Sequence, residues 1–150
     1  MEKEKKELFC LGAEAVSWGL IDSGVKGVFA YPGTPSTEVF EGVENIIKSQ
    51  KIPEGQVSQW AANEKVAYEI ALGVCYTGQR AAVTMKHVGL NVAMDPFVNS
   101  VISGIHGGLV VVVADDPSMH SSQNEQDSRL LATFAMAPCL EPSTIQEAYD

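Results

Sequence analysis

The stretch Leu109-Val110-Val111-Val112-Val113-Ala114 consists of six apolar residues, four of which are valine. A continuous β-branched run of this length is typical of a strand that is covered on both faces, and such strands belong to parallel sheets. We therefore predict that residues 109–114 form a strand at the centre of a parallel sheet.

Strand and helix patterns alternate along the rest of the chain. The predicted strands before the valine run are residues 26–31, 56–60 and 81–85. Helical spacing of apolar residues predicts helices over 8–21, 35–48, 64–77 and 90–101, the last interrupted or bent around Pro96. One further helix is expected to end near Phe134, and a last one to begin near Pro142. Thr34 can cap the second helix, with Pro35 at its first position. This alternation predicts an α/β fold: an open, mostly parallel sheet with helices on both faces.

Composition sets limits on partners and location. The chain has 150 residues, of which 45% are hydrophobic, and this fits one domain with its own core. A net charge of −9 argues against nucleic acid or an anionic membrane as a partner, and the longest apolar run is far below the ~20 residues of a membrane span. Cys10, Cys75 and Cys139 are far apart, which favours buried reduced thiols in a cytoplasmic protein.

Polar segments follow each predicted strand. They are residues 31–38, the turn at Glu64, residues 86–91 and residues 114–125. Ligands of open α/β sheets bind outside the carboxyl ends of the strands, so we expect these segments to converge on one site. Glu64 is notable because the helix that it begins is otherwise nearly apolar and should be buried on more than one side. The ordinary explanation is that a carboxylate in the first turn is stabilised by the helix dipole.

Four segments also carry a family resemblance. They are Tyr31-Pro32-Gly33-Thr34-Pro35-Ser36-Thr37-Glu38, Asn63-Glu64-Lys65-Val66-Ala67, Thr84-Met85-Lys86-His87-Val88-Gly89-Leu90-Asn91 and the thirteen residues 115–127. In this order they resemble the start of the indolepyruvate:ferredoxin oxidoreductase α subunit, over nearly the whole chain. The resemblance implies a thiamine-diphosphate enzyme that oxidatively decarboxylates indolepyruvate or other aryl-pyruvates to acyl-CoA and passes electrons through iron–sulfur clusters to ferredoxin. Residues 1–150 are then expected to be a single pyrimidine-binding domain.

The resemblance assigns roles to individual residues. Glu64 corresponds to the glutamate that contacts the aminopyrimidine ring of thiamine diphosphate, where a carboxyl group favours the imino tautomer that deprotonates the thiazolium ring. Thr34 is implied to lie near the substrate carboxylate or the reactive carbon, a role that competes with helix capping. Gly33, Pro35, His87 and Asn91 are the other expected cofactor contacts. For His87 a structural role is an equal alternative.

Other parts of such an enzyme are missing from these residues. The sequence has no Gly-Asp-Gly motif followed by the asparagine that helps to hold the diphosphate through Mg²⁺, and no ferredoxin-type cysteine cluster. We therefore expect a piece of a longer subunit, inactive alone. Its expected partners are a diphosphate-binding domain of the same or a neighbouring subunit, a second (β) subunit, coenzyme A and ferredoxin, within a homo-oligomer. We expect no metal site in the chain, because Asp115, Asp116 and His120 lack regular ligand spacing and fit loop architecture.

Two alternatives remain from the sequence. One is a non-catalytic binding or regulatory module with the same fold, against which the intact Glu64 and Thr34 argue. The other is a generic nucleotide-dependent enzyme, which requires a Gly-x-Gly-x-x-Gly turn that is lacking after the first predicted strand. Contacts with substrate or a neighbouring domain are expected from the polar loop, but its candidates have no assigned roles: Ser121, Ser122, Gln123 and Asn124.

Overall fold

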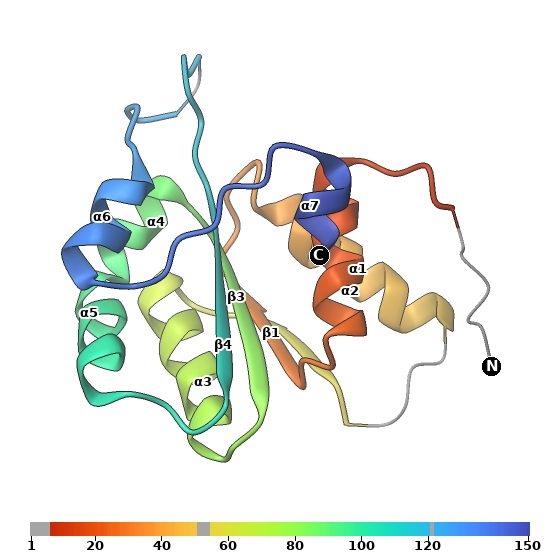
Figure 1. The fold of residues 1–150 in the computed structure, drawn as a ribbon, viewed down its shortest axis with the longest axis horizontal. Coiled ribbons are helices and arrows are strands. Elements are labelled where there is room, and N and C mark those ends of the chain that lie inside the picture. Colours follow the sequence, from red (N-terminus) through yellow and green to blue (C-terminus); the bar gives the residue numbers. More distant parts are fainter. Residues whose placement is uncertain (1–6, 51–54, 121) are drawn as a thin grey trace.

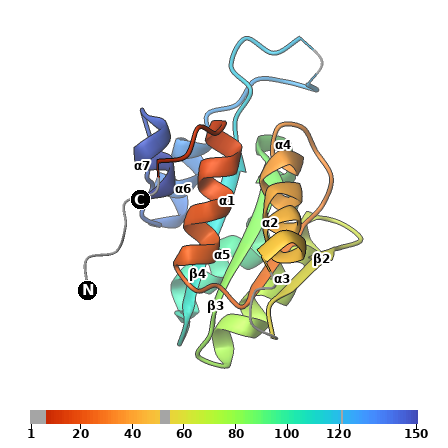
Figure 2. The same ribbon diagram turned by 90° about the vertical axis from the view of Figure 1, so that its right-hand side faces the viewer.

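The computed structural model describes residues 7–50, 55–120 and 122–150. Its strands form one parallel sheet in the order β2-β1-β3-β4. They are β1 (Gly27–Ala30), β2 (Val57–Trp60), β3 (Arg80–Lys86) and β4 (Gly108–Ala114). Helices cover both faces of the sheet (Figure 1 and Figure 2). The predicted α/β class is therefore confirmed.

The helices form two groups. On one face lie α1 (Gly12–Asp22) and α2 (Thr37–Gln50), and α7 (Ile145–Tyr149) packs on α1, where the Tyr149 hydroxyl donates to Asp22 at 2.6 Å. The other face is covered by α3 (Glu64–Tyr76), α4 (His87–Val92), α5 (Met94–Ser103) and α6 (Ser128–Ala135). The sheet thus separates two hydrophobic clusters, one on each face.

Burial of α3 explains its apolar sequence. Ala67, Tyr68, Ala71 and Cys75 are buried between the sheet and α5. The Tyr68 hydroxyl shares a hydrogen bond of 2.8 Å with Ser100 of α5, so the buried polar atom has a partner. Burial on more than one side, expected from the sequence, is confirmed.

The valine run does not occupy the centre of the sheet. β1 and β3 are the interior strands of the sheet, whereas β4, among the described residues, pairs only with β3 and forms an edge. Val110 is 46% exposed, and the rest of β4 is half-buried. A β-branched run indicates apolar surroundings on the two faces of a strand, but it does not show whether both of its backbone edges are paired. The prediction of a central position was wrong for that reason.

Two helix predictions are also corrected. Helix α2 begins at Thr37 and not at Pro35, because the Gly33 carbonyl accepts from the N–H groups of Ser36 at 2.8 Å and Thr37 at 3.2 Å and so closes a turn first. Thr34 is therefore not its cap. The helix expected to be interrupted or bent around Pro96 is interrupted, but the break is at Ala93, between α4 and α5. Pro96 lies in the first turn of α5, where its missing N–H costs no helical hydrogen bond.

The cysteines differ in burial. Cys75 is buried, its thiol donates to the carbonyl of Gly108 at 3.2 Å, and burial raises the pKa of this thiol. Cys10 is half-buried and Cys139 is exposed, so the expectation of buried thiols is confirmed for Cys75 only. In the described part of the chain, none of the helices combines the length and the apolar character needed to cross a membrane.

Candidate functional site

The carboxyl ends of the strands meet at one edge of the sheet. Ala30 of β1 pairs in register with Trp60 of β2 and Thr84 of β3, and Lys86 pairs with Ala114 at the end of β4. The polar segments that follow these residues therefore lie at the same edge, as predicted. The loop after β4 rises above this edge at the top of Figure 1.

Glu64 is the first residue of α3 at this edge. Asn63 caps the helix, because its side-chain oxygen accepts from the N–H of Val66 at 2.9 Å. Because Asn63 provides the cap, the Glu64 carboxyl is not used for capping. The Glu64 side chain is half-buried. The local sequence therefore directs a carboxyl group into the site.

The Glu64 side chain lies directly on Gly89, a buried residue of α4. A Cβ atom at position 89 would be 2.6 Å from Cγ and 2.7 Å from Oε1 of Glu64, closer than real Cβ atoms approach other atoms. Only a glycine leaves room for the carboxyl in this position. Sequence reasoning did not identify Gly89, although a glycine inside a helix, where it is destabilising, often marks a close approach.

Lys86 lies close to residues that follow two other strands. It is the last residue of β3, and its stem passes Gly33, where a Cβ atom would lie 3.4 Å from Lys86 Cβ. Its Nζ is 3.9 Å from Asp116 Oδ2, just after β4, and its side chain is 16% exposed. A largely buried ammonium group therefore lies at the carboxyl edge.

His87 is fully buried and contacts the loop after β4. Its Nε2 is 2.9 Å from the carbonyl oxygen of Asn124. Because a carbonyl oxygen only accepts, Nε2 carries the hydrogen, and in the neutral imidazole Nδ1 is then the acceptor. This Nδ1 is buried and has no hydrogen-bond partner among residues 7–50, 55–120 and 122–150. His87 thus has a structural contact on one side of its ring and an unused acceptor on the other.

The remaining predicted residues lie at the same edge but on its surface. Thr34, Pro35 and Asn91 are exposed, and Gly33 is half-buried with its N–H donating to the Thr37 hydroxyl at 2.9 Å. Within the described chain, the Thr34 hydroxyl and the Asn91 amide have no hydrogen-bond partner. The structure therefore places Glu64, Lys86 and His87 at the same carboxyl edge, where Glu64 contacts Gly89, Lys86 contacts Gly33 and His87 contacts Asn124, and it leaves Thr34 and Asn91 open to solvent.

The loop after β4 is held by its own side chains. Asp115 accepts from the N–H and hydroxyl of Ser128, and Asp116 accepts from the Ser122 hydroxyl. These bonds support the interpretation of the aspartates as loop architecture. No group of three or more potential metal ligands occurs in the described parts of the chain. Ser121 lies outside the described residues, and Gln123 is exposed.

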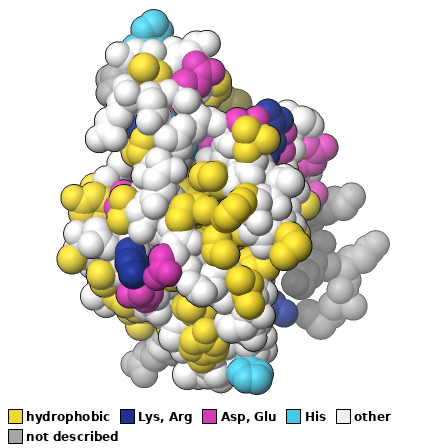
Figure 3. All heavy atoms as spheres, turned by 90° about the vertical axis from the view of Figure 1, so that its left-hand side faces the viewer, with side chains coloured by type: hydrophobic (Ala, Val, Ile, Leu, Met, Phe, Trp, Pro, Cys, Tyr) yellow, Lys and Arg dark blue, Asp and Glu magenta, His cyan; other side chains and the backbone are white. Residues whose placement is uncertain are grey.

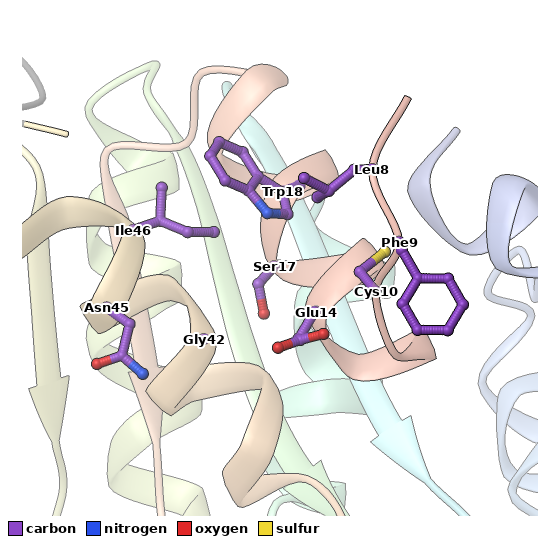
Figure 4. A pocket seen from close by; sticks show the side chains of 9 residues that line it. All are labelled: Leu8, Phe9, Cys10, Glu14, Ser17, Trp18, Gly42, Asn45 and Ile46. Carbon is purple, nitrogen blue, oxygen red and sulfur yellow. The ribbon is translucent and has the colours of Figure 1, made fainter. Parts of the chain in front are cut away.

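A pocket of about 240 Å³ lies away from this edge, between the segment before α1 and helices α1 and α2 (Figure 4). Two of its polar side chains are already engaged. Glu14 accepts from the N–H of Leu11 at 2.7 Å, and the Ser17 hydroxyl is 2.8 Å from the carbonyl of Val39. None of the residues that line this pocket was predicted as a site residue, and we do not assign it a ligand.

Comparison with known proteins finds similar sequences. No family profile matches the chain. Indolepyruvate oxidoreductase subunit IorA from Archaeoglobus fulgidus is 46% identical over 149 residues, 99% of this chain and 24% of the relative. The IorA subunit from Pyrococcus horikoshii is 48% identical over 149 residues, 99% of this chain and 22% of the relative. The chain is homologous to part of subunit IorA. It spans about a quarter of the length of these IorA relatives.

A solved structure supports the same relationship. The 2-oxoglutarate:ferredoxin oxidoreductase from Magnetococcus marinus, with 2-oxoglutarate, coenzyme A and succinyl-CoA bound, is similar with a TM-score of 0.62. The two are 26% identical, and the match covers 77% of this chain and 20% of that one. The IorA relatives and this solved structure are both named as oxidoreductases.

Proposed function

We propose that this chain is the pyrimidine-binding domain of a thiamine-diphosphate-dependent 2-oxoacid:ferredoxin oxidoreductase that converts indolepyruvate or another aryl-pyruvate to acyl-CoA. The observation that carries the proposal is the Glu64 carboxyl, which lies on Gly89 at the carboxyl edge of a parallel sheet. The similarity to IorA subunits supports the indolepyruvate substrate, and the likeness to a 2-oxoglutarate:ferredoxin oxidoreductase supports the reaction class.

The residues present fit an aminopyrimidine ring. A carboxyl group accepts hydrogen bonds when ionised and donates one when protonated, so Glu64 can hold a proton shared with a ring nitrogen. Gly89 provides the space that fixes this carboxyl against α4. Thiamine diphosphate, when bound, supplies the carbon nucleophile for the 2-oxo group. Its diphosphate and Mg²⁺ are held by another domain in this proposal.

The other residues of the edge bind and orient the substrate. Thr34 is exposed beside Gly33 and offers a hydroxyl to the substrate carboxylate or carbonyl oxygen. His87 keeps the loop at Asn124 in place through its Nε2–H. A positioned loop excludes water from a reacting centre, and this makes polar contacts there stronger.

The proposal includes partners that cover this chain in an assembly: a diphosphate-binding domain, a β subunit, and a second copy. Hydrophobic side chains gather on the face formed by α5 and α6 (Figure 3). On this face Ile102 is 72% exposed, Leu130 68% and Phe134 70%. Exposed apolar surface of this kind is typical of interaction sites. Ferredoxin is the proposed electron acceptor, through iron–sulfur clusters carried elsewhere.

The test is oxidation of indolepyruvate by the full-length protein that carries this chain, assembled with its β subunit, thiamine diphosphate, Mg²⁺ and coenzyme A. Reduction of ferredoxin or a viologen dye is the readout. We expect activity that requires thiamine diphosphate and is lost in Glu64→Gln. The matched control is Glu69→Gln, since Glu69 is an exposed carboxylate on the same helix.

Two results would distinguish the catalytic domain from the non-catalytic module. Activity without thiamine diphosphate, or full activity of Glu64→Gln, contradicts the proposed role of Glu64. No activity with any 2-oxoacid, despite bound cofactor and intact clusters, favours the non-catalytic module.

A further inference from the structure

The positive charges near the carboxyl edge are not equally neutralised. Lys65 is the second residue of α3, Lys86 is the last residue of β3 and Arg129 is the second residue of α6, so each lies at the end of its element next to this edge. Lys65 is 3.0 Å from Asp95 and 3.9 Å from Glu69, and its hydrogen bond with Asp95 raises its pKa. Arg129 is held between two carboxylates in the same way: Asp127 and Glu141, each at 2.8 Å.

Lys86 differs from both. Its described carboxylate neighbour is Asp116 alone, at 3.9 Å, which is beyond hydrogen-bond distance. Asp116 already accepts from the Ser122 hydroxyl. An ammonium group has three N–H donors, so Lys86 keeps donors for an added anion.

The position of this ammonium group indicates which anion it binds. The stem of Lys86 lies along Gly33, the residue before Thr34, and the next residue in sequence is the buried His87. The group is therefore at the same carboxyl edge of the sheet as Glu64, where the proposed reaction takes place. We propose that Lys86 binds the carboxylate of the 2-oxo acid. This inference rests on the proposed function, because a 2-oxoacid reaction is what brings a substrate carboxylate to this edge.

A diphosphate or the phosphates of coenzyme A fit this position less well. Lysine provides a compact point charge with flexible geometry, which suits a single carboxylate. A diphosphate carries more negative charge, and Asp115 and Asp116 follow β4 directly beside Lys86. Two carboxylates so close would repel it.

The experiment measures kcat and KM of the assembled full-length enzyme with Lys86→Met, which keeps the length of the side chain and removes its charge. We expect KM for the 2-oxo acid to rise by roughly 10- to 100-fold, because a hydrogen bond to a charged group is lost. We expect kcat to change by less than about threefold, as for a contact made equally in the ground state. KM for coenzyme A and the affinity for thiamine diphosphate should not change.

An uncharged analogue makes the assignment specific to the carboxylate. The amide of the same 2-oxo acid, used as a competitive inhibitor, should inhibit the wild type and Lys86→Met equally. Lys86→Arg keeps the charge and should restore much of the affinity for the acid. Lys26→Met serves as the matched control, because Lys26 is an exposed lysine that precedes β1 at the opposite edge.

Asp116→Asn tests whether Lys86 only holds the loop. If it does, Asp116→Asn and Lys86→Met should give the same kinetics; our proposal predicts that Asp116→Asn leaves KM for the acid unchanged or lowers it. An unchanged KM in Lys86→Met, in an enzyme whose wild type is active, overturns this inference and leaves the proposed function intact. A rise in KM for coenzyme A alone also overturns it. A wild-type assembly without 2-oxoacid activity removes the proposed function and this inference with it.

Discussion

Gly89→Ala tests the contact on which the site depends. The added Cβ would lie 2.6 Å from Cγ, 2.7 Å from Oε1 and 2.9 Å from Cδ of Glu64. All three atoms belong to one flexible side chain, so the carboxyl should move rather than the backbone. We expect the variant to fold but to hold Glu64 away from its present position.

The magnitude follows from two opposing effects. Crowding a filled site costs about 1–3 kcal/mol, and replacing a helical glycine by alanine gains about 1 kcal/mol. Gly89→Ala should therefore change the free energy of unfolding by between zero and about 2 kcal/mol in the destabilising direction. Gly73→Ala is the matched control, because Gly73 is an exposed glycine of α3 with no atom within 4 Å of an added Cβ. It should gain the full ~1 kcal/mol.

Urea unfolding of the single variants and of the Glu64→Ala/Gly89→Ala double variant gives the coupling between the two residues. With the Glu64 side chain removed, Gly89→Ala should become as favourable as Gly73→Ala. Equal effects of the two glycine substitutions in the wild-type background, or no coupling in the double variant, would refute the placement of Glu64 on Gly89.

Three further predictions concern the core, the loop and the apolar face. Tyr68→Phe loses the hydrogen bond to Ser100 and should cost about 1 kcal/mol in urea unfolding. Since burial raises the pKa of Tyr68 above its usual 10.0, wild-type stability should fall as pH rises above that value, and Tyr68→Phe should lessen the fall. His87→Ala should speed hydrogen exchange over residues 122–128, whereas His87→Gln, which retains an N–H donor, should do so less; equal exchange in both variants argues against the contact to Asn124. Phe134→Lys should leave stability within about 0.5 kcal/mol but reduce self-association in sedimentation velocity, and unchanged association would show that the α5–α6 face is not involved.

The sequence was sufficient to predict the class of fold and the edge at which the candidate site lies. Apolar runs and alternation located each strand of the described chain, and parallel pairing alone brings the segments after the strands together. It was insufficient for the order of strands. Val111 and Val113 pack against one hydrophobic cluster and Val112 against the other, whether or not a further strand is paired beside β4, so the apolar pattern could not reveal an edge position.

The contacts within the site depend on how separate elements approach one another. Glu64 and Gly89 are on different helices, and their contact follows from the packing of α3 beside α4. The partly neutralised charge of Lys86 likewise depends on its distance to Asp116, which follows a different strand. A helix cap at Thr34 was a reasonable local prediction, but the turn closed by the Gly33 carbonyl replaced it.

The most direct test of the central claim is exchange of the C2 proton of thiamine diphosphate bound to the complete enzyme, measured by NMR after quenching in D₂O. If Glu64 holds the proton at the pyrimidine ring, Glu64→Gln should slow this exchange by roughly 100- to 10,000-fold while cofactor affinity and fold are retained. Exchange at the wild-type rate in Glu64→Gln would contradict the assignment of this chain as the pyrimidine-binding domain with Glu64 as its catalytic carboxyl.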